Sequence, residues 1–304
     1  MHLLRIGVIA VGAGLLLWLF GFGGVADLSR WAVAGQEQAQ RALAGGLRAV
    51  RAGEPGAWLA LMGLCATYGF FHAAGPGHGK LVIGGYGAAA RVTARRLSGL
   101  ALLSSLAQAL SAVLLVALGA WVLGWSRAQM TDAAEVVLAP ASYIAIAAVG
   151  LWLLVRGARR MQRTAAPVPA HAPAPAHAPA ADRTSEASGP APAPTPEQVQ
   201  NITSWRDAAA IVGAIAIRPC TGAVFLLILC FGLGIPWAGV AGAFVMGLGT
   251  ASVTVLVAIA AVGARQSLLD SWQGAGALRA VAMVEMAAGG LIALIATTLA
   301  LPLL

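Results

Sequence analysis

Two histidines and a lysine lie close together in a stretch of the sequence that is otherwise apolar. The stretch from His72 to Lys80 reads HAAGPGHGK, and its second histidine is His78. Each charged group costs about 2.5–3.5 kcal/mol at the centre of a membrane helix, so such groups indicate a functional site. Because neutral imidazole is the commonest metal-binding side chain, we expect His72 and His78 to bind a divalent metal ion. The alternative is a structural role, with an imidazole bonded to a backbone carbonyl.

The centre of this stretch, Gly75-Pro76-Gly77, interrupts the helix, because proline lacks a backbone N–H and glycine is conformationally free. A broken helix persists at membrane depth only where its backbone is buried in protein or lines a wet cavity. The carbonyls that the break frees would add oxygen ligands or hold water molecules. Lys80 does not complete a Walker phosphate loop, since two residues that this pattern requires are absent. We expect Lys80 to be a cation at the cytoplasmic boundary.

A second polar interruption begins at Arg218 and includes Pro219 and Cys220. An arginine at this depth needs a partner, for which Glu285 is our candidate, and the pair would hold the two halves of the chain together or line an ion path. Cys220 is either a soft metal ligand or simply a small buried residue. Two further polar residues would line the same path or hydrogen-bond between helices: Thr221 and Gln108.

The composition is that of a membrane protein. Of the 304 residues, 59% are hydrophobic and only 10% are charged, and the mean hydropathy is +0.82. The sequence predicts an all-α, polytopic transmembrane bundle of six to seven helices, because apolar stretches of about 18 residues or more are typical of such helices. The stretches are residues 6–20, 57–74, 97–124, 136–156, 208–231, 237–263 and 281–303. The first is the weakest, and residues 1–26 would form a signal peptide or an anchor helix.

Membrane topology explains the formal net charge of +8 better than nucleic-acid binding does. Arginines concentrate in the loops after the second, fourth and sixth apolar stretches, which the positive-inside rule places in the cytoplasm. Residues 27–56 break this pattern, because they carry both arginines and acids. Their apolar spacing predicts an amphipathic, extracytoplasmic helix that lies in the membrane interface.

Residues 157–206 separate the membrane region into two halves. Their Pro- and Ala-rich sequence cannot form a packed core and predicts a disordered cytoplasmic linker. The halves, residues 57–156 and 207–304, share similar motifs in the same order and at nearly constant spacing. Three helices in each half make the two halves antiparallel. Inverted repeats with a broken helix at matching positions predict a transporter whose site lies at the repeat interface.

The two breaks do not lie at mirrored depths in their apolar stretches. Pro76 lies near the end of its stretch, whereas Pro219 lies near the middle of its own. Either the first helix starts later than Trp58, or the segment is re-entrant and bends back through Leu81–Ala90.

The stretch from Tyr68 to Lys80, paired with the stretch from Arg218 to Gly222, resembles the NicO family of nickel/cobalt exporters. The similarity spans about residues 40–303 without the linker. The resemblance implies a polytopic inner-membrane transporter that moves Ni²⁺ or Co²⁺ out of the cytoplasm, with His72 and His78 in the metal path. Gly75 stands where the best-known exporters of the family carry an acid.

The sequence therefore predicts an exporter of nickel, cobalt or both, with no enzymatic activity and no tightly bound cofactor. Histidine must lose a proton to bind a metal, which favours proton coupling through Glu285 or a histidine. The expected partners are the lipid bilayer and divalent metal ions, and a homo-oligomer is left open. Two alternatives are a membrane thiol–disulfide electron carrier that uses Cys220 and an exporter of a small organic solute.

Overall fold

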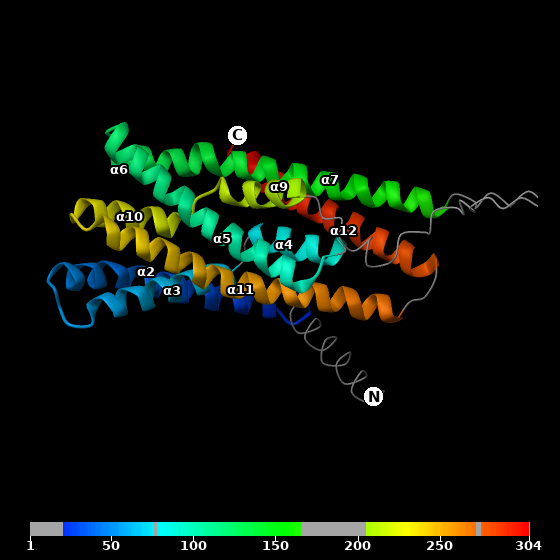
Figure 1. The fold of residues 1–304 in the computed structure, drawn as a ribbon, viewed down its shortest axis with the longest axis horizontal. Helices are drawn as coiled ribbons and strands as arrows, with labels where there is room; N and C mark the ends of the chain where they lie inside the picture. The colour runs from blue at the N-terminus through cyan, green and yellow to red at the C-terminus, as the bar shows by residue number, and fades with distance from the viewer. Residues whose placement is uncertain (1–20, 76–77, 91, 166–204, 272–274, 304) are drawn as a thin grey trace, which may run out of the picture.

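The computed structural model describes residues 21–75, 78–90, 92–165, 205–271 and 275–303. The first apolar stretch (residues 6–20), Pro76 and Gly77 of the first break, and most of the linker lie outside the described residues. All elements of the described part are helical (Figure 1). They are α2 (Gly24–Arg51), α3 (Ala57–Ala74), α4 (His78–Ala89), α5 (Ala94–Ala117), η1 (Leu118–Val122), α6 (Arg127–Asp132), η2 (Ala133–Leu138), α7 (Ala139–Ala165), α9 (Trp205–Ala216), α10 (Thr221–Gly232), α11 (Pro236–Ser271), α12 (Ala275–Ala300) and η3 (Leu301–Leu303).

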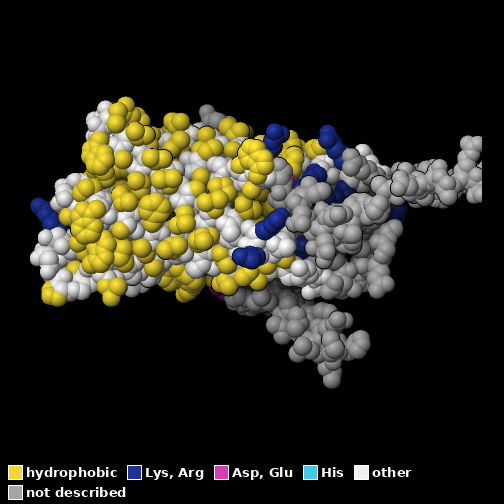
Figure 2. Space-filling view, in the orientation of Figure 1, with side chains coloured by type: hydrophobic (Ala, Val, Ile, Leu, Met, Phe, Trp, Pro, Cys, Tyr) yellow, Lys and Arg dark blue, Asp and Glu magenta, His cyan; other side chains and the backbone are white. Residues whose placement is uncertain are grey.

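The structure confirms a polytopic helical bundle. Helices α9 and α10 together pass the length and hydropathy criteria for a membrane span and are bent by 59° at the break between them. Five single spans among the described residues meet the same criteria: Ala57–Ala74, Ala94–Val122, Arg127–Gln162, Pro236–Ser267 and Arg279–Leu303. In the view of Figure 2, apolar side chains cover most of the described surface, and most of the visible Lys and Arg side chains gather toward one end.

Helix α3 alone meets the criteria for a span, and we call α3 and α4 together the first broken span because α4 follows the first break. Both sequence-based explanations of its depth are wrong. The Trp58 and Trp237 rings pack at 4.7 Å near the starts of α3 and α11. Further along both elements, Gly84 of α4 lies against Val257 of α11. From α3 to α4, the contacts move toward the C-terminal end of α11. Helix α4 therefore continues in the direction of α3 rather than bending back. Helix α3 also starts at Ala57, so it does not begin late.

The two halves run antiparallel, as the internal repeat predicts. Each broken span packs on the middle helix of the other half: α3 and α4 on α11, and α9 and α10 on α5. The middle helices α5 and α11 pack on each other, as do α7 and α12. In the latter pair, a Cβ added at Gly150 would lie 2.6 Å from the backbone nitrogen of Ala293. Small residues of this kind let membrane helices approach closely.

Helix α2 differs from the interfacial helix that the sequence predicts. It runs antiparallel to α3 along much of that helix, with Trp31 packed on Phe71 near one end and Gly46 against Leu61 near the other. A helix lying flat in the interface would cross a spanning helix instead. The buried side of α2 is built from small and aliphatic residues, which allow this close packing: Gly24, Ala32, Ala39, Leu43 and Leu47. The side of the membrane on which this segment begins or ends stays a prediction.

Two apolar clusters lie on either side of a polar band. On α5, Ala112 belongs to one cluster and Ala101 to the other, and polar residues lie between them. On α11, Met246 belongs to the same cluster as Ala112, and Ala258 belongs to the same cluster as Ala101. The first cluster also takes in α3 and α10, and the second takes in α4 and α9. Each broken helix therefore contributes one half to each cluster, and the breaks lie in the polar band.

Candidate functional site

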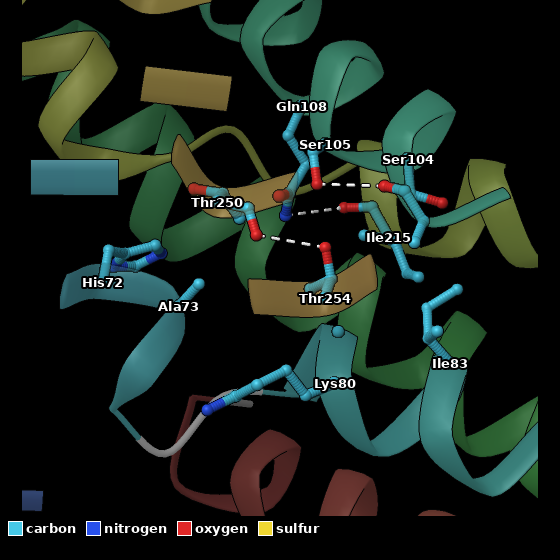
Figure 3. A pocket seen from close by; sticks show the side chains of 12 residues that line it. His72, Ala73, Lys80, Ile83, Ser104, Ser105, Gln108, Ile215, Thr250 and Thr254 are labelled. Atoms are coloured by element: carbon cyan, nitrogen blue, oxygen red, sulfur yellow. Dashed lines mark hydrogen bonds between the residues drawn. The ribbon is translucent and has the colours of Figure 1, made fainter. Parts of the chain in front are cut away.

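A small cavity lies where the two broken spans and the two middle helices meet (Figure 3). Its volume is about 50 Å³. The first span contributes residues on both sides of its break, and the second contributes Ile215 just before its own break. The repeat interface therefore contains a cavity, and the transport site that the sequence places at this interface stays a prediction. The lining residues are His72, Ala73, Gly79, Lys80, Ile83, Ala101, Ser104, Ser105, Gln108, Ile215, Thr250 and Thr254.

His72 brings an imidazole to the wall of this cavity from the last turn of α3. Its ring stacks on Tyr68, with centroids 6.0 Å apart and planes 9° apart. Among the described residues, His72 forms no hydrogen bond, so its ring nitrogens are available to a ligand. His78 is the first residue of α4, but its side chain lies outside the described part of the chain. The predicted pair of metal ligands therefore stays a prediction.

Lys80 folds back onto the first break instead of extending to the cytoplasmic boundary. Its Nζ donates hydrogen bonds to the backbone oxygens of Gly75 and, at 3.3 Å, Ala74. These carbonyls end α3 and have no helical partner, so a cation there also complements the helix dipole. Lys80 is thus part of the cavity wall and stabilises the break.

Gln108 of α5 stabilises the second break from across the bundle. Its Nε2 donates to the backbone oxygens of Ile215 at 3.2 Å and Arg218 at 3.4 Å. On the opposite middle helix, Thr250 Oγ1 donates to the backbone oxygen of Gly69 at 3.2 Å. Each middle helix therefore uses a polar side chain to bind the broken span of the other half.

The ion pair predicted between Arg218 and Glu285 is wrong. The Arg218 side chain donates to the Tyr143 hydroxyl and pairs with Glu135, with Nη2 and Oε2 3.6 Å apart. Thr221 also donates to Glu135, at 3.2 Å. Sequence reasoning missed Glu135, although this acid directly precedes the apolar stretch at 136–156.

Glu285 instead joins the two halves through a different pair of arginines. Its carboxylate is fully buried and contacts Arg156 Nε and, at 2.8 Å, Arg160 Nη1. Both arginines lie on α7, whereas Glu285 lies on α12. Glu285 therefore forms its ion pairs with partners that the sequence did not indicate.

Cys220 caps the start of α10 and is absent from the cavity lining. Pro219 lies in the break just before it. Among the described residues, no group of three or more His, Cys, Asp or Glu could hold a metal ion. The described part of the cavity thus offers one imidazole, several hydroxyl and amide oxygens and one ammonium.

Part of the chain is similar to known proteins. Residues 58–190 match the model of the NicO family, described as "High-affinity nickel-transport protein". The resemblance to the NicO family is confirmed over these residues. The NicO match includes both sides of the first break and the α5 residues of the cavity, whereas α9 to α12 lie beyond it.

A curated relative from Haemophilus influenzae carries the name "Putative nickel/cobalt efflux system". It is 27% identical over 192 residues, which cover 60% of this chain and 59% of the relative. The chain thus aligns with less than two thirds of that relative's length. No solved structure matches the chain.

Proposed function

We propose that this protein exports nickel, cobalt or both from the cytoplasm across the bacterial inner membrane. The observation that carries the proposal is the cavity between the two broken spans, with His72 in its wall. Imidazole suits divalent nickel and cobalt. The NicO match and the name of the curated relative support the same class of substrate.

The arrangement of the two apolar clusters supports alternating access. One cluster contains Leu61 and Leu226, the other contains Ile83 and Ile211, and the cavity residues lie between them on α5 and α11. Separating one cluster while the other stays packed would expose the cavity to one side at a time. Rocking of one repeat against the other is the usual motion of such transporters.

We further propose that protons drive export. A protonated imidazole cannot bind metal, so proton and metal compete for His72. Glu285 already holds two arginine partners, which gives it a role in joining α7 to α12. This leaves the histidines as the proposed proton carriers.

Metal accumulation in cells tests the proposal. Cells that express the wild-type protein should contain less nickel or cobalt than cells without it, and His72→Ala should abolish the difference. The matched control is His177→Ala, the same substitution in the linker, which should behave as wild type. Equal metal content with and without the wild-type protein, at confirmed protein levels in the membrane, would reject the export function.

A further inference from the structure

Four polar side chains around the cavity already donate their hydrogens to backbone carbonyls: Ser105, Gln108, Thr250 and Thr254. A hydroxyl has one hydrogen to donate and two lone pairs that accept. Three lining hydroxyls donate to backbone carbonyls: Ser105 to Ala101 at 3.0 Å, Thr250 to Gly69 at 3.2 Å, and Thr254 to Thr250 at 3.0 Å and Ala251 at 3.1 Å. These three hydroxyls can therefore accept hydrogen bonds from a ligand but have no hydrogen left to donate to it.

The Gln108 amide behaves in the same way. Its nitrogen donates to two carbonyls at the end of α9, so only its oxygen is left for a ligand. Ser104 adds a buried hydroxyl that has no hydrogen-bond partner among the described residues. A cavity that offers acceptors favours a ligand that is rich in hydrogen-bond donors.

The charges around the cavity argue against a tight metal chelate. None of the described lining residues carries a carboxylate, and Lys80 places a positive charge in the wall. Among the described lining residues, a bare divalent ion would exchange its hydration for one imidazole, a few neutral oxygens and this ammonium. A hydrated ion keeps its hydration and turns the hydrogens of its water molecules toward the oxygens. The cavity volume of about 50 Å³ holds about three to five water-sized groups at about 10–15 Å³ each, so a shell of six waters would extend beyond the cavity.

We propose that the cavity binds a hydrated divalent cation through its water shell, with His72 replacing at most one water molecule. This inference rests on the proposed function and names the form in which the ion is recognised. Weak binding of this kind suits transport, because an ion must leave the site as readily as it enters.

The test uses hexaamminecobalt(III), whose six ammonia ligands donate hydrogens and do not exchange. Calorimetry should detect its binding to the purified full-length protein. Thr254→Val removes one acceptor and should weaken this binding about tenfold, as expected for a hydrogen bond to a charged ligand. Ser105→Ala should act in the same direction, and Thr254→Ser should restore wild-type binding. Thr297→Val is the control, because the exposed Thr297 hydroxyl donates to Ala293 at 2.7 Å outside the cavity.

The outcomes separate this inference from the export function. Absence of hexaamminecobalt(III) binding, or equal loss in Thr254→Val and Thr297→Val, would overturn the water-shell proposal even if proteoliposomes transport Ni²⁺. Binding of the complex that Thr254→Val weakens selectively would support it. Failure of the proteoliposomes to transport Ni²⁺ or Co²⁺ would count against the export function alone.

Discussion

The ring of Tyr68 lies directly against Gly222, so the two broken spans touch at a point where Gly222 has no room for a side chain. Tyr68 lies on α3 one turn before His72, and Gly222 lies in the first turn of α10. A Cβ added at Gly222 would overlap the ring. The Tyr68 hydroxyl also accepts a hydrogen bond from Gln36 of α2 at 3.2 Å. The ring is thus held between three helices beside the cavity.

Gly222→Ala should therefore destabilise the protein and reduce metal transport. Overpacking of this kind costs about 1–3 kcal/mol. The matched control is Gly232→Ala at the other end of α10, where a Cβ would meet nothing within 4 Å. Thermal unfolding in detergent measures the difference between the two variants. Equal melting temperatures would mean that the Tyr68 contact relaxes at no cost.

Glu285→Gln should lower stability through the loss of a buried charge that two arginines share. Breaking such a pair costs about 3–5 kcal/mol, and we expect the lower end because Arg156 and Arg160 are 29% and 32% exposed. Glu37→Gln provides the comparison, since Glu37 forms an exposed pair with Arg41 at 3.5 Å and contributes under about 1 kcal/mol. A melting temperature that falls equally in both variants would contradict the structural role of Glu285.

Gln108→Leu should lower the stability of the protein by destabilising the backbone at the second break. It removes the donor that two carbonyls share and leaves them unpaired, at a cost of about 1–3 kcal/mol. Leu110→Ala, an exposed change on the same helix, should cost less. Thermal unfolding of both variants checks this order, and a smaller loss in Gln108→Leu than in Leu110→Ala would refute it.

Metal binding should weaken as the pH falls, because protonated imidazole cannot bind a metal. In His72→Ala this part of the pH dependence should disappear. Titration of the purified protein with Ni²⁺ at several pH values measures the effect. An identical pH profile in wild type and His72→Ala would exclude His72 as a direct ligand.

Local properties of the sequence were enough to predict the helices and the two breaks. The length of an apolar stretch determines whether it can span a membrane, and Pro and Gly interrupt a helix wherever they occur in it. The repeated motifs then predicted antiparallel halves and a site between them. The cavity at His72 and Ile215 lies at that interface.

The partners of the charged side chains were decided only by the tertiary structure. Arg218 pairs with Glu135, and Glu285 pairs with Arg156 and Arg160, across helices that are far apart in the sequence. The sequence also did not predict the direction of the Lys80 side chain. The carbonyls that Lys80 binds are available only because α3 ends at this point. Helix rotation and register determine such contacts, and both depend on packing between surfaces that hydropathy alone does not distinguish.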